Sequence, residues 1–308
     1  MTGSGYILRK LLALPVMLLA VSLLTFLAVR MLPGDPARLI AGPEASAEAV
    51  AAIHAQLGLD QPVGAQYLAF LVHAAGGDLG TSIESRRPVT VELASHLPYT
   101  IALGLAAYGL AVGLGVPGGI LAAAAPGKRW DQAFSAATIL ALSLPSFWVG
   151  LMAMELFAVR LRWLPLMGAG SASHIVLPAL ALSLAPMGLI GRMTRAAMIE
   201  VLGQNYVRTA RAKGLAPFAI YVRHALPAAA TPIVTIVGLN LGAVIAGAVV
   251  TESVFSWPGV GRLLVDAVKY RDYPVIQAVT LTAVVSVALA NLGAELAIAF
   301  LDPKMRRG

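Results

Sequence analysis

Six long stretches with no charged residue, or almost none, constrain the fold of this chain more than any other feature. They are Leu11–Val29, Thr100–Ala125, Ala133 to about Ala158, Ile175–Gly191, Ala228–Thr251 and Pro274 to about Leu301. The 19 residues of the first stretch, rising about 1.5 Å each as an α-helix, are enough to cross roughly 30 Å of hydrocarbon. Since lipid offers no partner to backbone polar groups, we predict an all-α integral membrane protein with six transmembrane helices.

The composition excludes several other classes of protein. Of the 308 residues, 58% are hydrophobic and only 12% are charged, which is far from the composition of a soluble domain. The absence of cysteine excludes disulfides and thiolate chemistry. The net charge of +7 could suit nucleic acid, but no basic run is interleaved with aromatic residues as a nucleic-acid surface requires. We therefore expect no nucleic-acid partner, and a lipid membrane as the surroundings.

The distribution of Lys and Arg predicts the orientation. With alternating sides, 13 of the 22 Lys and Arg residues fall in the segments assigned to the inside. The long segment 32–97 is discounted because long loops cross the membrane regardless of charge. A cleaved signal peptide is the alternative for the first stretch, but its apolar core is too long and no cleavage site follows. We predict that both termini are cytoplasmic.

The chain divides into three predicted parts: an N-terminal transmembrane helix over 1–31, a small extracytoplasmic cap over 32–97, and a five-helix core over 98–308. In the cap, Ser46 can begin one helix and Tyr67–Ala75 can form another, closed by Gly76 and Gly77. Prolines inside or near the spans invite kinks, and they are Pro117, Pro145, Pro178, Pro186 and Pro232.

A basic island at 203–227 separates two of the apolar stretches. Asn205 is a suitable N-cap for a short helix over 206–213, and Gly214 is placed where a left-handed residue would end it. Ala210 and Gly214 are four residues apart, so they should present a nearly bare patch to another protein. An alternative is that the six basic residues between Arg192 and Arg223 have no binding role and reflect only the excess of Lys and Arg on the cytoplasmic side of membrane proteins.

The island resembles the cytoplasmic coupling loop of ABC-importer permeases, in the branch of dipeptide, oligopeptide and nickel importers. Four residues match the general pattern of that loop, namely Ala210, Gly214, Leu226 and Pro227. Arg208 and Thr209 replace its usual Glu and Ala, but YVRTARAKGL is the form found in this branch. LGLDQPVGAQYLAFL, GDLGTS, SLPSFWVG, ESVFSWPGVGRLL and RDYP also resemble the branch, so the resemblance covers nearly all of 8–303.

This resemblance implies a type I ABC importer permease fold and a set of partners. The partners would be a second homologous permease subunit, two ATPase subunits that hold ATP and Mg²⁺, and an extracytoplasmic solute-binding protein. The chain itself would carry no cofactor, and it would lie in the bacterial inner membrane. The implied ATPase-coupling residues are Asn205, Tyr206, Arg208, Thr209, Ala210, Arg211, Lys213, Gly214, Leu226 and Pro227.

The segment 251–275 is predicted to form a re-entrant hairpin on the outer side. Pro258, Gly259 and Gly261 force a turn ahead of a short amphipathic helix. Irregular backbone at membrane depth is tolerated only where it lines protein or a watery cavity, so the hairpin is a candidate outer gate. The candidate gate and docking residues are Phe255, Trp257, Pro258, Gly259, Gly261, Arg271 and Asp272.

No enzymatic motif is present: the sequence lacks a phosphate-binding GxxxxGK[ST] loop, HExxH and GxSxG. The five histidines are scattered, so we predict no metal site. Charged or polar residues within spans should face the bundle interior, where they join helices or line the pathway. These residues are Glu155, Asn291 and Glu295.

The predicted function is that of a permease subunit in an ATP-driven importer working by alternating access. An autonomous secondary transporter is the alternative, but it would carry its own ion site and usually an internal repeat, which is not evident. A membrane anchor for an enzyme complex would leave the cap and the hairpin unexplained. The resemblance leaves the substrate open among dipeptides, longer peptides, glutathione, nickel complexes and opines.

Overall fold

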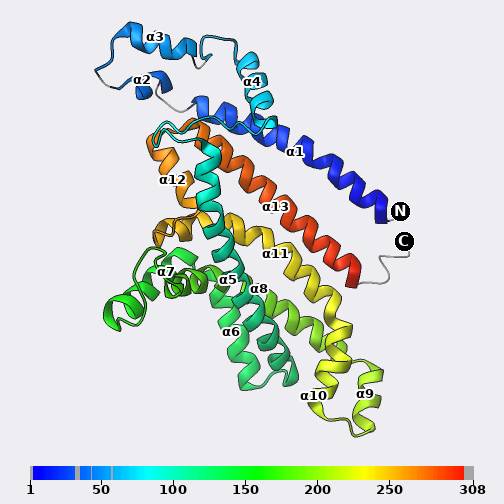
Figure 1. Cartoon of the computed structure of the whole chain (residues 1–308). Coiled ribbons are helices and arrows are strands. Elements are labelled where there is room, and N and C mark those ends of the chain that lie inside the picture. The colour runs from blue at the N-terminus through cyan, green and yellow to red at the C-terminus, as the bar shows by residue number, and fades with distance from the viewer. Residues whose placement is uncertain (1–2, 32–34, 43, 57, 302–308) are drawn as a thin grey trace. The chain divides into compact units, whose positions relative to one another are not determined.

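The computed structural model describes residues 3–31, 35–42, 44–56 and 58–301 of the chain (Figure 1). Its long helices are α1 (Gly3–Met31), α5 (Val89–Ala124), α6 (Arg129–Ser143), α8 (Val176–Leu202), α11 (Leu226–Val254) and α13 (Tyr273–Leu301). Its short helices are α2 (Pro36–Ala41), α3 (Ala47–Gln56), α4 (Val63–Ala75), α7 (Ser146–Ala153), α9 (Asn205–Ala212), α10 (Pro217–Ala219) and α12 (Val260–Tyr270). Within these residues the only strand pairing is the isolated bridge between Thr81 and Pro88, so the all-α prediction is confirmed.

Four helices among the described residues are long and apolar enough to cross a membrane, and they belong to α5, α8, α11 and α13. The pair α6 and α7 adds a fifth crossing if it forms one span. The apolar part of α1 in the same residues, Pro15–Met31, is shorter. Six transmembrane helices therefore remain a prediction, which counts α1 as the first.

Residues 133–158, predicted as one span, do not form one straight helix. Helices α6 and α7 meet at an angle of 104°, with Leu144 and Pro145 in extended conformations between them. The residue before a proline avoids helical dihedrals, and Pro145 has no N–H with which to continue the helix. Pro186, by contrast, lies inside the unbroken helix α8, so only one of these two prolines ends a helix.

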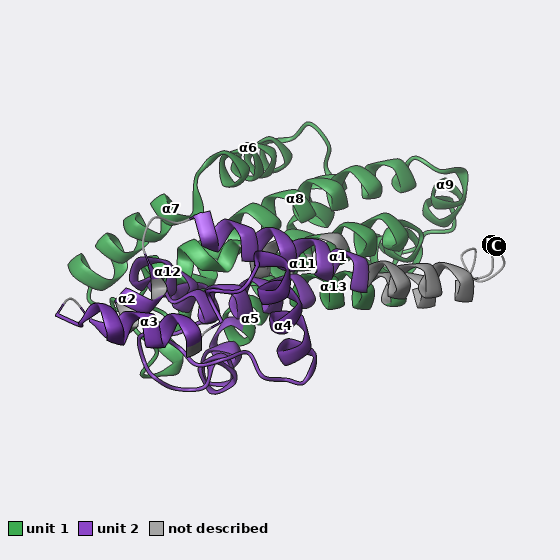
Figure 2. Ribbon diagram, turned by 90° about the horizontal axis from the view of Figure 1, so that it is seen from above, with its two compact units in different colours: residues 1–7, 101–257, 286–308 green, residues 8–100, 258–285 purple. Residues whose placement is uncertain are grey.

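The described chain separates into two compact units, which Figure 2 shows in different colours. Unit 1 comprises residues 1–7, 101–257 and 286–308, and unit 2 comprises 8–100 and 258–285. In unit 1, small residues of α5 and α8 pack closely with Trp257. This apolar core contains Leu103, Ala107, Ala179, Leu182, Ala248 and Trp257.

Unit 2 has its own apolar core, where α12 packs with the ends of three longer helices. This core contains Val29, Val89, Leu93, Val260, Ala267, Val275, Ile276, Ala278 and Val279. The Val260 N–H donates to Thr100 Oγ1 at 2.8 Å, which fixes the first turn of α12 to α5. Both helices predicted in the cap are present: Ser46 Oγ accepts from the Ala49 N–H at the start of α3, and α4 begins at Val63, four residues earlier than predicted.

Candidate functional site

The short helix α9 lies in the basic island, between the end of α8 and a turn at Gly214. Gln204 is its N-cap, with extended dihedrals and no side-chain hydrogen bond to the helix. The prediction that Asn205 is the N-cap is wrong, because Asn205 is already the first helical residue. Gly203 ends α8, so a single extended residue is enough to reverse the chain into α9.

The predicted left-handed residue at the other end of α9 is confirmed. Gly214 has φ of +75°, and its N–H donates to the Arg211 carbonyl at 2.9 Å. A glycine adopts this conformation without the steric cost that a β-carbon brings. A β-carbon on Gly214 would meet no atom within 4 Å, so the position faces open space.

One face of α9 packs against α8 of the same chain. Val207 and Ala210, three residues apart, are both buried, and they pack in one apolar cluster with Met198 and Leu202 of α8. The prediction that Ala210 forms a bare patch with Gly214 for another protein is therefore wrong. Residues three apart share a helix face, and this face is the one that attaches α9 to the bundle.

The outer face of the island carries both charge and large apolar side chains. The exposed polar residues on α9 and its turn are Asn205, Arg208, Thr209, Arg211 and Lys213. Tyr206, Leu215 and Phe218 are also exposed, and Phe218 reaches 76%. Large apolar groups exposed beside a basic helix are typical of a surface that another protein covers.

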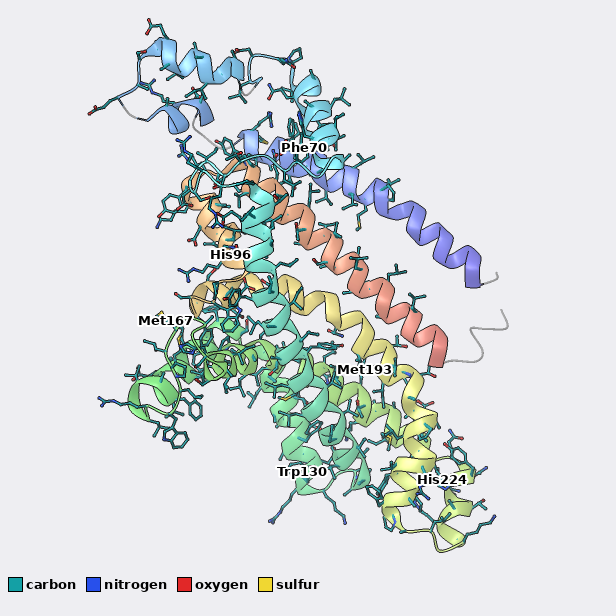
Figure 3. The ribbon with its side chains drawn as sticks, in the orientation of Figure 1. Phe70, His96, Trp130, Met167, Met193 and His224 are labelled. Atoms are coloured by element: carbon teal, nitrogen blue, oxygen red, sulfur yellow. The ribbon has the colours of Figure 1, made fainter. Side chains whose placement is uncertain are left out.

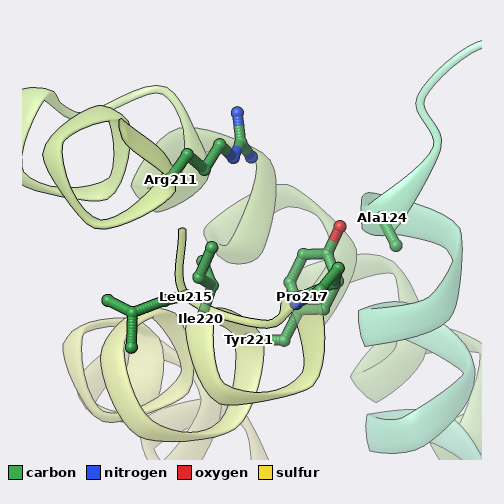
Figure 4. A pocket seen from close by; sticks show the side chains of 6 residues that line it. All are labelled: Ala124, Arg211, Leu215, Pro217, Ile220 and Tyr221. Carbon is green, nitrogen blue, oxygen red and sulfur yellow. The ribbon is translucent and has the colours of Figure 1, made fainter. Parts of the chain in front are cut away.

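Figure 4 shows a shallow pocket where this island meets the last turn of α5. Its lining consists of Ala124, Arg211, Leu215, Pro217, Ile220 and Tyr221. Leu226 packs against the apolar cluster that contains Val207 and Met198. Pro227 lies in the first turn of α11. A π-helical turn, Ile220–Ala225, leads directly into α11, and Ala225 has helical dihedrals. Pro227 has no N–H to donate back to that turn, and it lies where the helix changes from the π to the α form.

The sequence analysis missed an ion pair on α8, one helical turn before Met198. The Arg195 guanidinium on α8 donates through Nε to Asp131 Oδ1 on α6, and through a terminal nitrogen to Oδ2 at 2.8 Å. The Asp131 carboxylate also accepts the Gly127 N–H at 2.8 Å, and its side chain is only 4% exposed. Sequence analysis counted Arg195 only as a charge on the inner side, because nothing local links residues 64 positions apart.

Glycines bring α5, α6 and α8 unusually close together. A β-carbon on Gly119 of α5 would lie 2.5 Å from the Gly191 carbonyl oxygen of α8. The Phe134 ring of α6 fills the space beside Gly118 and Gly191, at 2.5 and 2.7 Å from the β-carbons those residues lack. Helices in membranes approach most closely at small residues, so this junction is tightly packed.

Segment 251–275 contains the predicted turn and short helix. Helix α11 ends at Val254, the chain turns through Pro258, and α12 follows, with Arg271 left-handed at its end. Five of the seven candidate gate or docking residues are buried in this chain, namely Phe255, Trp257, Gly259, Gly261 and Asp272. Their side chains or backbones build the segment, so they are not available as docking contacts.

Asp272 holds the RDYP and GDLGTS motifs together. Its carboxylate accepts hydrogen bonds from the Ser82 hydroxyl and from the Glu84 N–H at 3.2 Å, and it caps the first turn of α13 through the Val275 N–H. A β-carbon on Gly80 would lie 3.6 Å from Pro274. Partial burial raises the pKa of Glu84, and repulsion from neighbouring carboxylates, including that of Asp272, adds to the rise.

We expect Asp272→Ala to destabilise the protein by about 1–3 kcal/mol, because it leaves buried donors on the 82–84 loop without an acceptor. Thermal unfolding of the purified protein measures the effect. Asp266→Ala is the matched control, because Asp266 is half-exposed and only 3.7 Å from Arg262, where an ion pair contributes about 1 kcal/mol or less. Equal unfolding temperatures for the two variants would contradict the role of Asp272.

The polar residues within the apolar stretches have different surroundings. Glu155 is 49% exposed and pairs with Arg160 at 3.0 Å within the same turn, so the expectation that it faces the bundle interior is not met. Asn291 lies against α11, with its side-chain oxygen 3.1 Å from the β-carbon that Gly242 lacks. The side chain of Glu295 lies outside the described residues. Glu252, which the sequence analysis overlooked, is fully buried.

In the part of the chain that the structure describes, no group of three or more potential ligands is placed to hold a metal ion.

Two family models match the chain. The model described as "Binding-protein-dependent transport system inner membrane component" matches residues 115–307. The model described as "Binding-prot-dependent transport system membrane comp, N-term" matches residues 4–104.

Individual relatives match along almost the whole length. The glutathione transport system permease protein GsiC of Salmonella choleraesuis (strain SC-B67) is 45% identical over 303 residues, which is 98% of this chain and 99% of that protein. GsiC of Escherichia coli (strain K12) is 43% identical over 302 residues, with the same coverage. In fold, the chain is similar to the MetNI methionine ABC transporter in an inward-facing conformation, with a TM-score of 0.59, 20% sequence identity, and coverage of 68% of this chain and 96% of that one.

Proposed function

The chain belongs to the inner membrane components of binding-protein-dependent transport systems, and we propose that this permease imports glutathione or short peptides of similar size. It is a multi-pass permease subunit of an ABC importer, and ATP is bound in partner subunits. The observation that carries the substrate proposal is the 45% identity to a glutathione permease, sustained over 98% of this chain.

The proposed assembly contains two ATPases on the cytoplasmic side and a solute-binding protein outside, and a related permease completes the pore. Six spans with both termini in the cytoplasm place the basic island inside and segment 251–275 outside. The proposed division is an N-terminal helix over 1–31, a cap over 32–97 and a transport core over 98–308. The excess of Lys and Arg near the inner ends of the spans supports this orientation.

The proposed coupling surface is the outer face of α9 and the turn that follows it. Tyr206, Leu215 and Phe218 would pack on an ATPase, and the exposed Arg208, Arg211 and Lys213 would approach its acidic groups. Val207 and Ala210 attach the opposite face to α8, so a displacement of α9 moves the end of α8 with it. Such a rigid-body movement of packed helices is the kind that switches a pore between two states.

A reconstituted transporter tests this function. Proteoliposomes that contain the permease and its partner subunits, with binding protein added outside, should accumulate labelled glutathione only when ATP is present inside. Unlabelled glutathione should compete strongly, an α-linked tripeptide less, and nickel ions not at all. Uptake without ATP would favour a secondary transporter, whereas ATP-driven uptake of the peptide alone would overturn only the glutathione assignment.

A further inference from the structure

Helix α4 of the cap has an apolar face that the rest of the chain leaves uncovered. The helix carries no Asp, Glu, Lys or Arg, and none of its residues is buried. Leu68 and Val72 lie four residues apart on one face and are 63% and 71% exposed. Exposure of this face to water would be unfavourable, because the transfer of each large aliphatic side chain out of water is favourable by about 1.5–3 kcal/mol.

The opposite face of α4 packs along α1. The Tyr67 hydroxyl donates to the Leu19 carbonyl at 3.0 Å and lies 2.8 Å from the Ser22 hydroxyl. The Phe26 ring of α1 contacts the rings of Tyr67 and Phe70, with centroids 5.2 and 6.0 Å apart. Figure 3 labels Phe70 at this contact between the two helices.

These contacts place α4 at a definite depth. Leu19 lies eleven residues before Arg30, the charged residue at the end of the first apolar stretch, which is about 16 Å along a helix. The hydrocarbon layer is about 30 Å thick, so the Tyr67 hydroxyl reaches the middle of the first span. Phe26, which contacts Phe70, lies four residues before Arg30 and is also inside the apolar stretch. Exposed apolar side chains of α1, such as Val16 and Leu24, continue the uncovered surface at this depth.

Polar side chains of α4 bond to groups of the same chain, as a lipid environment favours. The Gln66 amide donates to the carbonyls of Leu59 at 3.1 Å and Gln61 at 2.7 Å, and it accepts from Arg30. His73 Nδ1 lies 2.8 Å from the Ala69 carbonyl. The Arg30 guanidinium lies 3.5 Å from the centre of the Phe26 ring, so its apolar stem and charge follow α1 back toward Gln66.

We propose that α4 is embedded in the lipid bilayer, with Leu68 and Val72 in contact with acyl chains beside α1. The orientation proposed above assigns it to the outer leaflet, but the depth does not depend on that orientation. The apolar part of the predicted cap is then a membrane anchor that holds α1 in place. It is not a seat for the solute-binding protein.

Single cysteines test the proposal directly, because the native chain has none. Leu68→Cys and Val72→Cys in the complete transporter, reconstituted in liposomes, would carry a small fluorescent thiol label. Leu24→Cys on α1, 67% exposed, is the control for lipid, and Glu48→Cys on α3 is the control for water. Co-purification of the ATPase subunits checks that each variant is assembled.

We expect lipids that carry a quencher on the acyl chain to quench the labels at 68 and 72 to within about twofold of the label at 24. Aqueous iodide should quench these labels at least about fivefold less than the label at 48. Equal iodide quenching at 68, 72 and 48 would overturn the proposal. Protection that appears only when binding protein is added, or disulfide crosslinking to the second permease subunit, would also overturn it and identify the occupant.

Discussion

Replacing Gly214 with tryptophan will abolish ATP-driven transport while the permease still inserts and folds. The backbone at Gly214 has φ of +75°, where a β-carbon costs about 1 kcal/mol, and no atom lies within 4 Å of that β-carbon. The variant therefore loses little stability in the isolated chain. An indole at the end of α9 would nevertheless project from the surface proposed to bind an ATPase, and it would keep the two proteins apart.

Gly77→Trp is a matched control for this variant. Gly77 follows α4 with φ of +82°, and a β-carbon there would also meet no atom within 4 Å. The two variants have similar backbone conformations and add the same side chain, but only Gly214 follows α9. Substrate uptake and the amount of co-purified ATPase measure the difference. Normal uptake by Gly214→Trp with ATPases bound would refute the coupling role of α9.

Arg195→Met will produce the largest loss of stability that we expect from a single substitution in unit 1. Removing one partner of a buried ion pair costs about 3–5 kcal/mol, because the remaining charge is left in an apolar setting. Asp131 is that remaining charge, and the Gly127 N–H would be its only remaining partner among the contacts described above. Asp131→Asn should cost less, because the Arg195 side chain is 30% exposed and its charge can reach water.

The double variant Asp131→Asn with Arg195→Met separates the pair from its surroundings. It should be more stable than Arg195→Met alone, because the buried negative charge is gone. The difference between its change in stability and the sum of the two single changes measures the coupling energy. Arg192→Met on the exposed side of α8 is the control and should change stability by about 0.5 kcal/mol or less. The measurements are the thermal unfolding temperature and the substrate transported per ATP. Strict additivity of the two single substitutions would show that no coupling exists.

The same pair should matter for transport, since it lies between α9 and the bent helices. Arg195 precedes Met198 by one turn of α8, and Met198 packs with Val207 of α9. Asp131 lies in the first turn of α6, which leads to the 104° bend before α7. Loss of the Asp131–Arg195 pair should therefore lower the amount of substrate transported per ATP hydrolysed more than it lowers the rate of ATP hydrolysis.

Features that depend on neighbouring residues could be predicted from the sequence. Apolar runs long enough to cross lipid predicted where the long helices lie, because a backbone in lipid has almost no alternative to a helix. Helices α11 and α13 match their runs to within a few residues, whereas α1, α5 and α8 extend 8 to 11 residues beyond theirs at one end. The left-handed Gly214 and the cap at Ser46 are also local, since each depends on a turn of a few residues. The family could be predicted too, because its motifs are continuous in sequence.

Features that depend on which face of a helix is covered could not be predicted. Ala210 is small enough to suit either a partner protein or its own bundle, and only its place in the apolar cluster with Met198 and Leu202 of α8 decided between them. The docking residues were predicted wrongly for the same reason. Asp272 looks like a surface carboxylate in the sequence, and only the structure places Ser82, 190 residues earlier, beside it.

Sequence by itself determined that this chain is a helical membrane permease, and it predicted the short helix in the basic island that we propose as the coupling helix. Tertiary structure alone decided which of the predicted prolines breaks a span, which charges are paired, and which cap helix lies against α1. The physical reason is that length, hydropathy and glycine geometry act within a few turns of chain, whereas burial is a property of residues that meet from distant segments. The Asp131–Arg195 pair and the Tyr67–Leu19 contact are both of that second kind.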